Sequence, residues 1–184
     1  QECRRSWIAE GKDYDYDTLT SMAENAQPLA SLIRPEDPRF GKPGNMPEKI
    51  VDYCRETGQP VPASAKAVVR CALESLSLLY ADILETCALI TGKKFRKLHI
   101  VGGGSKNRLL NQWTANATRM RVIAGPAEAT ATGNILIQAR ALGPVSAGKW
   151  VYPFADIHDA IVGAGRIAAD APRELTISIS ATRL

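Results

Sequence analysis

The sequence contains three consecutive glycines whose bare backbone could seat a ligand: Gly102, Gly103 and Gly104. They follow residues 97–101, a short apolar run with β-branched side chains that predicts a buried strand. Glycine has no Cβ and tolerates positive φ angles, so a flat or anionic ligand can approach such a turn closely. Ser105 comes next and is expected to cap a helix over residues 106–120. The positive end of that helix would then lie beside the turn.

The spacing of the glycines matches neither common nucleotide motif. It is not the GxGxxG dinucleotide fingerprint, and Ser105 and Lys106 follow too soon for the GxxxxGK[ST] phosphate loop. A Gly-rich turn between a strand and a helix is also often only a tight connection. Asn107 lies in the first turn of the expected helix, where its amide could bind a ribose hydroxyl or an adenine edge, or could only support the turn.

Composition limits the classes of protein that need to be considered. A chain of 184 residues with a formal net charge of +4 suits one globular domain. The basic residues look scattered, without the basic stripe and interleaved aromatics of a nucleic-acid-binding protein. No apolar run reaches the roughly 18 residues of a membrane span, and no secretory signal is visible. The first residue is not Met, which predicts that the front of a longer protein is missing. The four cysteines and two histidines lack metal-ligand spacing.

Hydrophobic periodicity predicts helices around the Gly-rich turn. They are expected over residues 1–10, 17–25, 47–57, 64–91, 127–142 and 156–169, with a second strand at 121–124. Asp17 is expected to cap the second of these helices. The helix over 64–91 has an apolar stripe wide enough to be buried on more than one side. Its acidic residues Glu74, Asp82 and Glu85 are expected to be solvated. Two strands among long helices predict an α/β fold.

Several longer phrases resemble one protein family. HIVGGGSKNRLLNQ at residues 99–112, VIAGPAEATATGN at 122–134 and LLYADIL at 78–84 are similar to the nucleotide-binding C-terminal domain of the FGGY carbohydrate kinases. DPRF at residues 37–40 and CRETGQPVP at 54–62 are most similar to the branch of that family that phosphorylates L-rhamnulose. The similarity covers about residues 1–143, and the fold it implies is the C-terminal half of an actin-like (ribonuclease H-like) ATPase. Residues 144–184 would form a closing helix and a tail of uncertain structure.

The resemblance also implies ligands and site residues. ATP with Mg²⁺ is expected, and Gly103 corresponds to the family's ATP contact, with Gly102, Gly104 and Asn107 beside it. Gln1 corresponds to a glutamine described as an ATP contact, although its residue type alone favours a solvent-facing terminus. A disulfide between Cys54 and Cys71 is implied as well. A reducing cytosol opposes such a bridge.

The resemblance further implies how the chain would work. The sugar would bind mainly to a missing N-terminal domain, which also carries the catalytic base, so this chain alone is expected to be inactive. A cytoplasmic location is expected, with no nucleic-acid or membrane partner. Another FGGY kinase, such as one acting on xylulose, is an alternative. So is a non-catalytic nucleotide-binding or interaction module whose Gly-rich turn is structural.

Overall fold

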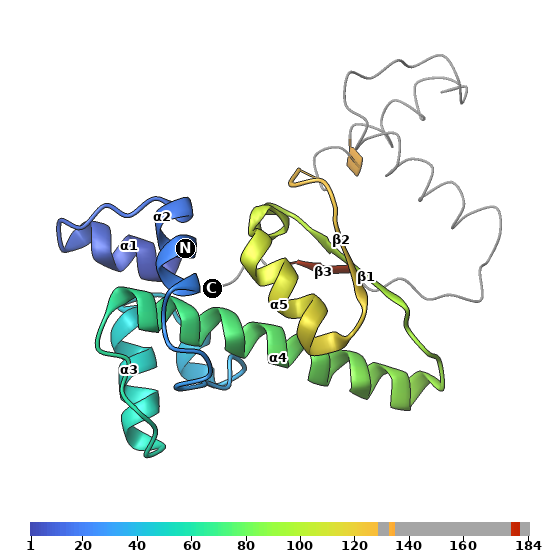
Figure 1. Ribbon diagram of the computed structural model, residues 1–184, viewed down its shortest axis with the longest axis horizontal. Coiled ribbons are helices and arrows are strands. Elements are labelled where there is room, and N and C mark those ends of the chain that lie inside the picture. Colours follow the sequence, from blue (N-terminus) through green and yellow to red (C-terminus); the bar gives the residue numbers. More distant parts are fainter. Residues whose placement is uncertain (129–132, 135–177, 181–184) are drawn as a thin grey trace, which may run out of the picture.

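The structure is a computed structural model that describes residues 1–128, 133–134 and 178–180 (Figure 1). In chain order its elements are α1 (Glu2–Ala9), α2 (Tyr16–Glu24), η1 (Pro38–Gly41), α3 (Met46–Glu56), α4 (Ala65–Thr91), β1 (Lys97–Val101), η2 (Gly103–Lys106), α5 (Arg108–Thr118), β2 (Arg121–Ala124) and β3 (Ser178–Ser180). Of the helix expected over 127–142, residues 127–128 form a turn and 133–134 are helical. The helix expected over 156–169 lies outside the described residues. The α/β prediction is confirmed as a mixture of helices and strands.

The strands form a parallel sheet with the order β2-β1-β3 (Figure 1). Leu98 faces Val122 in the β1–β2 register, and Ile100 faces Ala124. Both expected strands are therefore confirmed. Parallel neighbours need a crossover, and α5 supplies the one between β1 and β2 while packing on α4. Leu98 and Ile100 are fully buried, so β1 is the interior strand that holds the Gly-rich turn in place.

The helix α4 connects two hydrophobic clusters. The first lies around its amino-terminal half and includes Met46, Ile50, Cys54 and Cys71; the second includes Leu84, Phe95, Leu98 and Ile100. This double role explains the wide apolar stripe seen in the sequence. The stripe does not stay buried to the end of the helix, because Leu89 and Ile90 are 80% and 79% exposed. Within the described part of the chain, no helix is long and apolar enough to cross a membrane.

Two expectations about acidic residues are wrong. Glu74 is buried rather than solvated, because its carboxylate pairs with Arg70 on the next turn of α4. The helix α2 is capped by Asp15, whose carboxylate accepts a hydrogen bond from the Thr18 N–H, and not by Asp17. Sequence periodicity locates a helix better than it locates the terminal residue, since the cap depends on local backbone geometry.

Candidate functional site

The Gly-rich turn lies at the carboxyl end of β1, where open parallel sheets commonly bind ligands. Gly102 has φ 84° and ψ −173°, a conformation that residues with a Cβ rarely adopt. The glycine is therefore required by the turn itself. The residues that follow form the 3-10 turn η2. His99 precedes the turn, and partial burial, with a smaller contribution from Lys97, lowers its pKa, so the ring is neutral at pH 7.

Gly103 is the outward-facing glycine of the turn. It is exposed, whereas Gly102 and Gly104 are half-buried and Ser105 is buried. A Cβ added to Gly103 would meet no atom of the described residues within 4 Å. The backbone at Gly103 is thus open to solvent and can be approached by another molecule. The three glycines are not sealed in the core.

A second turn, after β2, is hydrogen-bonded to the end of β1 and to the Gly-rich turn. The N–H of Gly102 donates to the carbonyl of Pro126 at 3.1 Å, and the N–H of Gly125 donates to the carbonyl of Ile100 at 2.8 Å. A Cβ on Gly125 would lie 2.8 Å from Cγ1 of Val101, closer than side chains tolerate. In the sequence, Gly125 and Pro126 only follow the strand expected over residues 121–124. Its contact with the Gly-rich turn follows from the parallel β1–β2 pairing, which places the carboxyl ends of the two strands side by side.

The expected cap of the following helix is wrong. Ser105 lies buried inside η2, where its N–H donates to the carbonyl of Gly102 at 3.0 Å. The helix α5 begins after this 3-10 turn, and Asn107 is its N-cap, with Oδ1 accepting from the N–H of Leu110 at 3.0 Å. The predicted closeness of Asn107 to the turn is confirmed. Its amide oxygen caps α5 and so supports the turn, while a contact of its amide with a ribose hydroxyl or an adenine edge stays a prediction.

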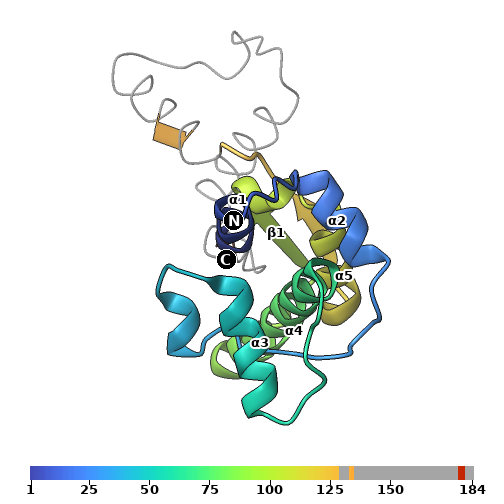
Figure 2. The ribbon, with the colours of Figure 1, turned by 90° about the vertical axis from the view of Figure 1, so that its left-hand side faces the viewer.

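Gln1 directly precedes α1 and is exposed. Its carbonyl accepts a hydrogen bond from the N–H of Arg5 at 2.9 Å. The two ribbon views place the N-terminus and the start of α5 above α4 (Figures 1 and 2). The helix expected over 1–10 is confirmed as α1, and Gly11 follows it with φ 81°. Gln1 is thus on the same side of α4 as the Gly-rich turn.

Cys54 and Cys71 are buried in the same cluster, on α3 and α4. The four cysteines are free in this structure. Burial, reinforced by the neighbouring Cys54 thiol, raises the pKa of Cys71 to about 12. The two thiols are therefore neighbours, as a disulfide requires, and the Cys71 thiol is protonated at neutral pH.

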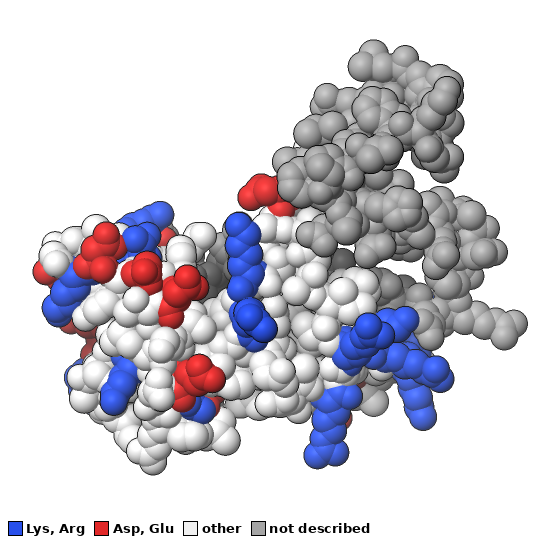
Figure 3. Space-filling view, turned by 45° about the horizontal axis from the view of Figure 1, so that its top comes forward, with Lys and Arg blue, Asp and Glu red and all other residues white. Residues whose placement is uncertain are grey.

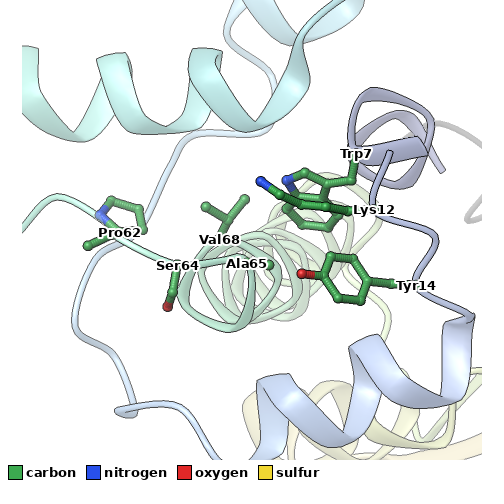
Figure 4. A pocket seen from close by; sticks show the side chains of 8 residues that line it. Trp7, Lys12, Tyr14, Pro62, Ser64, Ala65 and Val68 are labelled. Carbon is green, nitrogen blue, oxygen red and sulfur yellow. The ribbon is translucent and has the colours of Figure 1, made fainter. Parts of the chain in front are cut away.

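A cavity of roughly 270 Å³ lies elsewhere, at the amino end of α4 (Figure 4). Its lining residues are Trp7, Lys12, Tyr14, Pro62, Ala63, Ser64, Ala65 and Val68. The rings of Trp7 and Tyr14 meet edge to face at 5.7 Å, and the ammonium of Lys12 pairs with Glu10 at 3.1 Å. Trp7 and Tyr14 thus contact each other, and Lys12 is paired with a residue outside the lining. None of the expected site residues lines this cavity.

The surface charges are less scattered than expected. Basic residues gather over the far end of α4 and the segment that leads to β1 (Figure 3), where the exposed residues are Lys93, Lys94, Arg96 and Lys97. This basic surface is at the amino end of β1. The Gly-rich turn lies at the other end of this strand, after its carboxyl terminus.

A parallel sheet with an open glycine turn at its carboxyl edge, followed by a capped helix, agrees with the family expectation. Residues 1–142 match the FGGY family of carbohydrate kinases, C-terminal domain, and the chain belongs to that family.

Two relatives are similar over much of the chain. A rhamnulokinase of Bacteroides thetaiotaomicron is 46% identical over 143 residues, which are 78% of this chain and 29% of that protein. A rhamnulokinase of Enterobacter sp. (strain 638) is 46% identical over 134 residues, which are 71% of this chain and 27% of that protein. The chain thus spans less than a third of the length of these curated relatives.

Proposed function

We propose that this chain is the adenosine-binding portion of a rhamnulokinase, which transfers the γ-phosphoryl group of ATP to L-rhamnulose and yields ADP and L-rhamnulose 1-phosphate. The observation that carries the proposal is the open backbone of Gly103, above which no described atom lies within 4 Å of an added Cβ. A purine or ribose can rest on such a surface without displacing a side chain. The names of the two relatives supply the sugar.

The residues that would contact ATP belong to three elements. Gly102, Gly103 and Gly104 would lie against the adenosine, Asn107 would hold the start of α5 beside it, and Gln1 would approach from α1. The bare turn fits a nucleotide because a ligand can occupy the space that a Cβ on Gly103 would fill. Mg²⁺ would arrive with the phosphates and neutralise their charge. Its protein ligands are proposed to come from the rest of the longer protein.

Catalysis would depend on the part of the protein that precedes this domain. Phosphoryl transfer to a sugar hydroxyl needs positioned phosphates, Mg²⁺ and a base for the hydroxyl proton. In the proposed two-domain, actin-like arrangement, the first domain supplies that base and most sugar contacts. This chain supplies the nucleotide wall of the cleft between the domains. We therefore expect the chain alone to bind ATP without phosphorylating L-rhamnulose. A cytoplasmic location is part of the same proposal.

Two alternatives remain as outcomes of the test. Another FGGY kinase, such as a xylulokinase, would use the same nucleotide turn with a different sugar. A non-catalytic nucleotide-binding or interaction module would lack the phosphoryl transfer. The rhamnulokinase names of both relatives favour the first proposal over these two.

Isothermal titration calorimetry of the chain with ATP, with and without Mg²⁺, tests the proposal. We expect saturable heat with ATP and with ADP, and none with L-rhamnulose alone. A flat ATP titration would instead favour a structural turn. Joining the chain to the N-terminal part of a relative and comparing L-rhamnulose with xylulose as acceptor would then identify the sugar.

A further inference from the structure

The Gly-rich turn is pinned by a chain of hydrogen bonds that ends on a side chain of α5. The carbonyl of Pro126 accepts from the N–H of Gly102, and the carbonyl of Gly102 accepts from the N–H of Ser105. The carbonyl of Ser105 in turn accepts from Nδ2 of Asn111 at 2.7 Å. The turn is therefore held from the β2 side by backbone, and from the α5 side by the side chain of Asn111 and by the N–H of Asn107, which donates to the carbonyl of Gly104 at 3.0 Å.

The other end of this amide has a different environment. Among the described residues, Oδ1 of Asn111 and Oγ1 of Thr114 are the buried side-chain polar atoms without a hydrogen-bond partner. A buried acceptor without a partner costs stability. An apolar residue of similar size, such as leucine, would remove that cost but would also leave the carbonyl of Ser105 without its donor. The bond made by the donor end of the Asn111 amide is therefore what distinguishes the asparagine from a leucine here.

We infer that Asn111 is a positioning residue for nucleotide binding. It fixes the carbonyl of Ser105 and so sets the orientation of the exposed Gly103 backbone against the nucleotide. The inference rests on the proposed function, because it assigns Gly103 to the nucleotide. Asn111 itself lies half-buried behind the turn and acts through Ser105. The unpartnered Oδ1 is a local cost that accompanies this function, as happens at sites where function and stability compete.

Asn111→Leu separates this role from ordinary packing. The leucine removes the unpartnered oxygen but leaves the carbonyl of Ser105 without its donor, so one unpaired acceptor replaces another and the midpoint of thermal unfolding should change little. Amide hydrogen exchange at Ser105 and Asn107, measured without nucleotide, should become faster because the turn loosens. The affinity for ATP should fall by about tenfold, the equivalent of roughly one hydrogen bond. Asn116→Leu is the matched control, because Asn116 is exposed on the same helix and its amide pairs only with Gln112 among the bonds described.

Asn111→Asp adds a pH profile that a packing role would not produce. A protonated carboxyl can donate to the carbonyl of Ser105, whereas the carboxylate cannot, and burial raises the pKa of the introduced group. Two cations belong to the surroundings of Asn111: Arg108 lies one turn before it on α5, and from α4 the guanidinium of Arg70 lies over the ring of Trp113, two residues further along. The variant should bind ATP more tightly as pH falls through the pKa of its new carboxyl. The unmodified chain and Asn116→Asp should not show this change.

The outcomes separate the two proposals. Equal ATP affinity for the unmodified chain and Asn111→Leu, or unchanged exchange at the turn, would overturn the role of Asn111 and leave the proposed function intact. An unmodified chain that binds no ATP would overturn the proposed function and the nucleotide role of Asn111 together. Faster exchange, lower affinity and unchanged thermal stability in Asn111→Leu would establish the inference.

Discussion

The guanidinium of Arg70 and the carboxylate of Glu74 form an ion pair one turn apart on α4, with 2.8 Å between Nε and Oε1. Only 10% and 9% of the two side chains are exposed. Nη1 of Arg70 also donates to carbonyls at and just after the end of α2, those of Ala23, Glu24 and Ala26. The same guanidinium lies 4.7 Å from the ring centre of Trp113 on α5. One buried cation thus connects α2, α4 and α5, the helix that begins beside the Gly-rich turn.

Arg70→Met should lower the free energy of unfolding by about 3–5 kcal/mol, because it leaves the carboxylate of Glu74 buried without its counter-charge. Urea denaturation followed by circular dichroism measures this loss. Adding Glu74→Gln should restore part of it, since the amide oxygen can still accept from the N–H of Leu29. Arg55→Met is the control, because its ion pair with Asp52 is on the surface and should contribute little. If Arg70→Met lost no more unfolding free energy than Arg55→Met, the buried ion pair would not be needed for stability.

Gly103→Val should weaken ATP binding while the chain stays folded. The added side chain enters open space, so the midpoint of thermal unfolding should change little. The same side chain would occupy the surface proposed for the adenosine. Calorimetry should show a loss of at least about tenfold in affinity, equivalent to roughly 1.4 kcal/mol. Gly41→Val is the matched control, because it is also exposed and open but lies in η1. Unchanged affinity would remove Gly103 from the site.

Gly125→Ala should destabilise the chain by about 1–3 kcal/mol through overpacking. The new Cβ would lie 2.8 Å from Cγ1 of Val101 and 3.4 Å from the carbonyl oxygen of Ile100. Relief requires the turn after β2 to move away from the Gly-rich turn, so ATP affinity should fall as well. Chemical denaturation and calorimetry give the two values. Gly41→Ala, which meets no described atom within 4 Å, should leave both unchanged.

A disulfide between Cys54 and Cys71 should form when the chain is held in an oxidising glutathione buffer. The two thiols are neighbours in the core. A disulfide that closes the loop over residues 54–71 should add about 3 kcal/mol to the free energy of unfolding. Mass spectrometry after alkylation under non-reducing conditions should find these two cysteines unmodified and linked. Cys54→Ser should abolish the product, and Cys87→Ser should not. A bridge that forms through Cys3 or Cys87 instead would contradict the proposed pairing.

The reduced chain should lose stability at alkaline pH. Burial raises the pKa of Cys71 from 9.0 to about 12, so the unfolded chain releases this proton before the folded chain does. The contribution of Cys71 is therefore complete below pH 9 and decreases as the pH rises toward 12, by up to roughly 1.4 kcal/mol for each unit. Urea denaturation of the reduced protein across this range measures the slope. Cys71→Ala should reduce the slope, and an identical slope would assign it to other groups.

Much of the local structure was predictable from the sequence. The strands at 97–101 and 121–124 and the long helix ending at Gly92 follow from apolar periodicity and from glycine stop signals, which depend on neighbouring residues only. The three glycines indicated the candidate site, since only residues without Cβ give an open backbone next to a strand. The family expectation also came from sequence phrases, and the match over residues 1–142 confirms it.

Tertiary structure decided what those elements contact. Glu74 has an ordinary acidic position on its helix, and it is buried only because Arg70 and the end of α2 meet it there. Ser105 looked like a cap, but η2 continues the turn and makes Asn107 the cap instead. The support of the Gly-rich turn by Pro126 depends on the parallel pairing of β1 with β2, which no local pattern encodes. Burial, capping and the approach of one turn to another depend on residues far apart in the chain, and these are positioned only when the helices pack on the sheet.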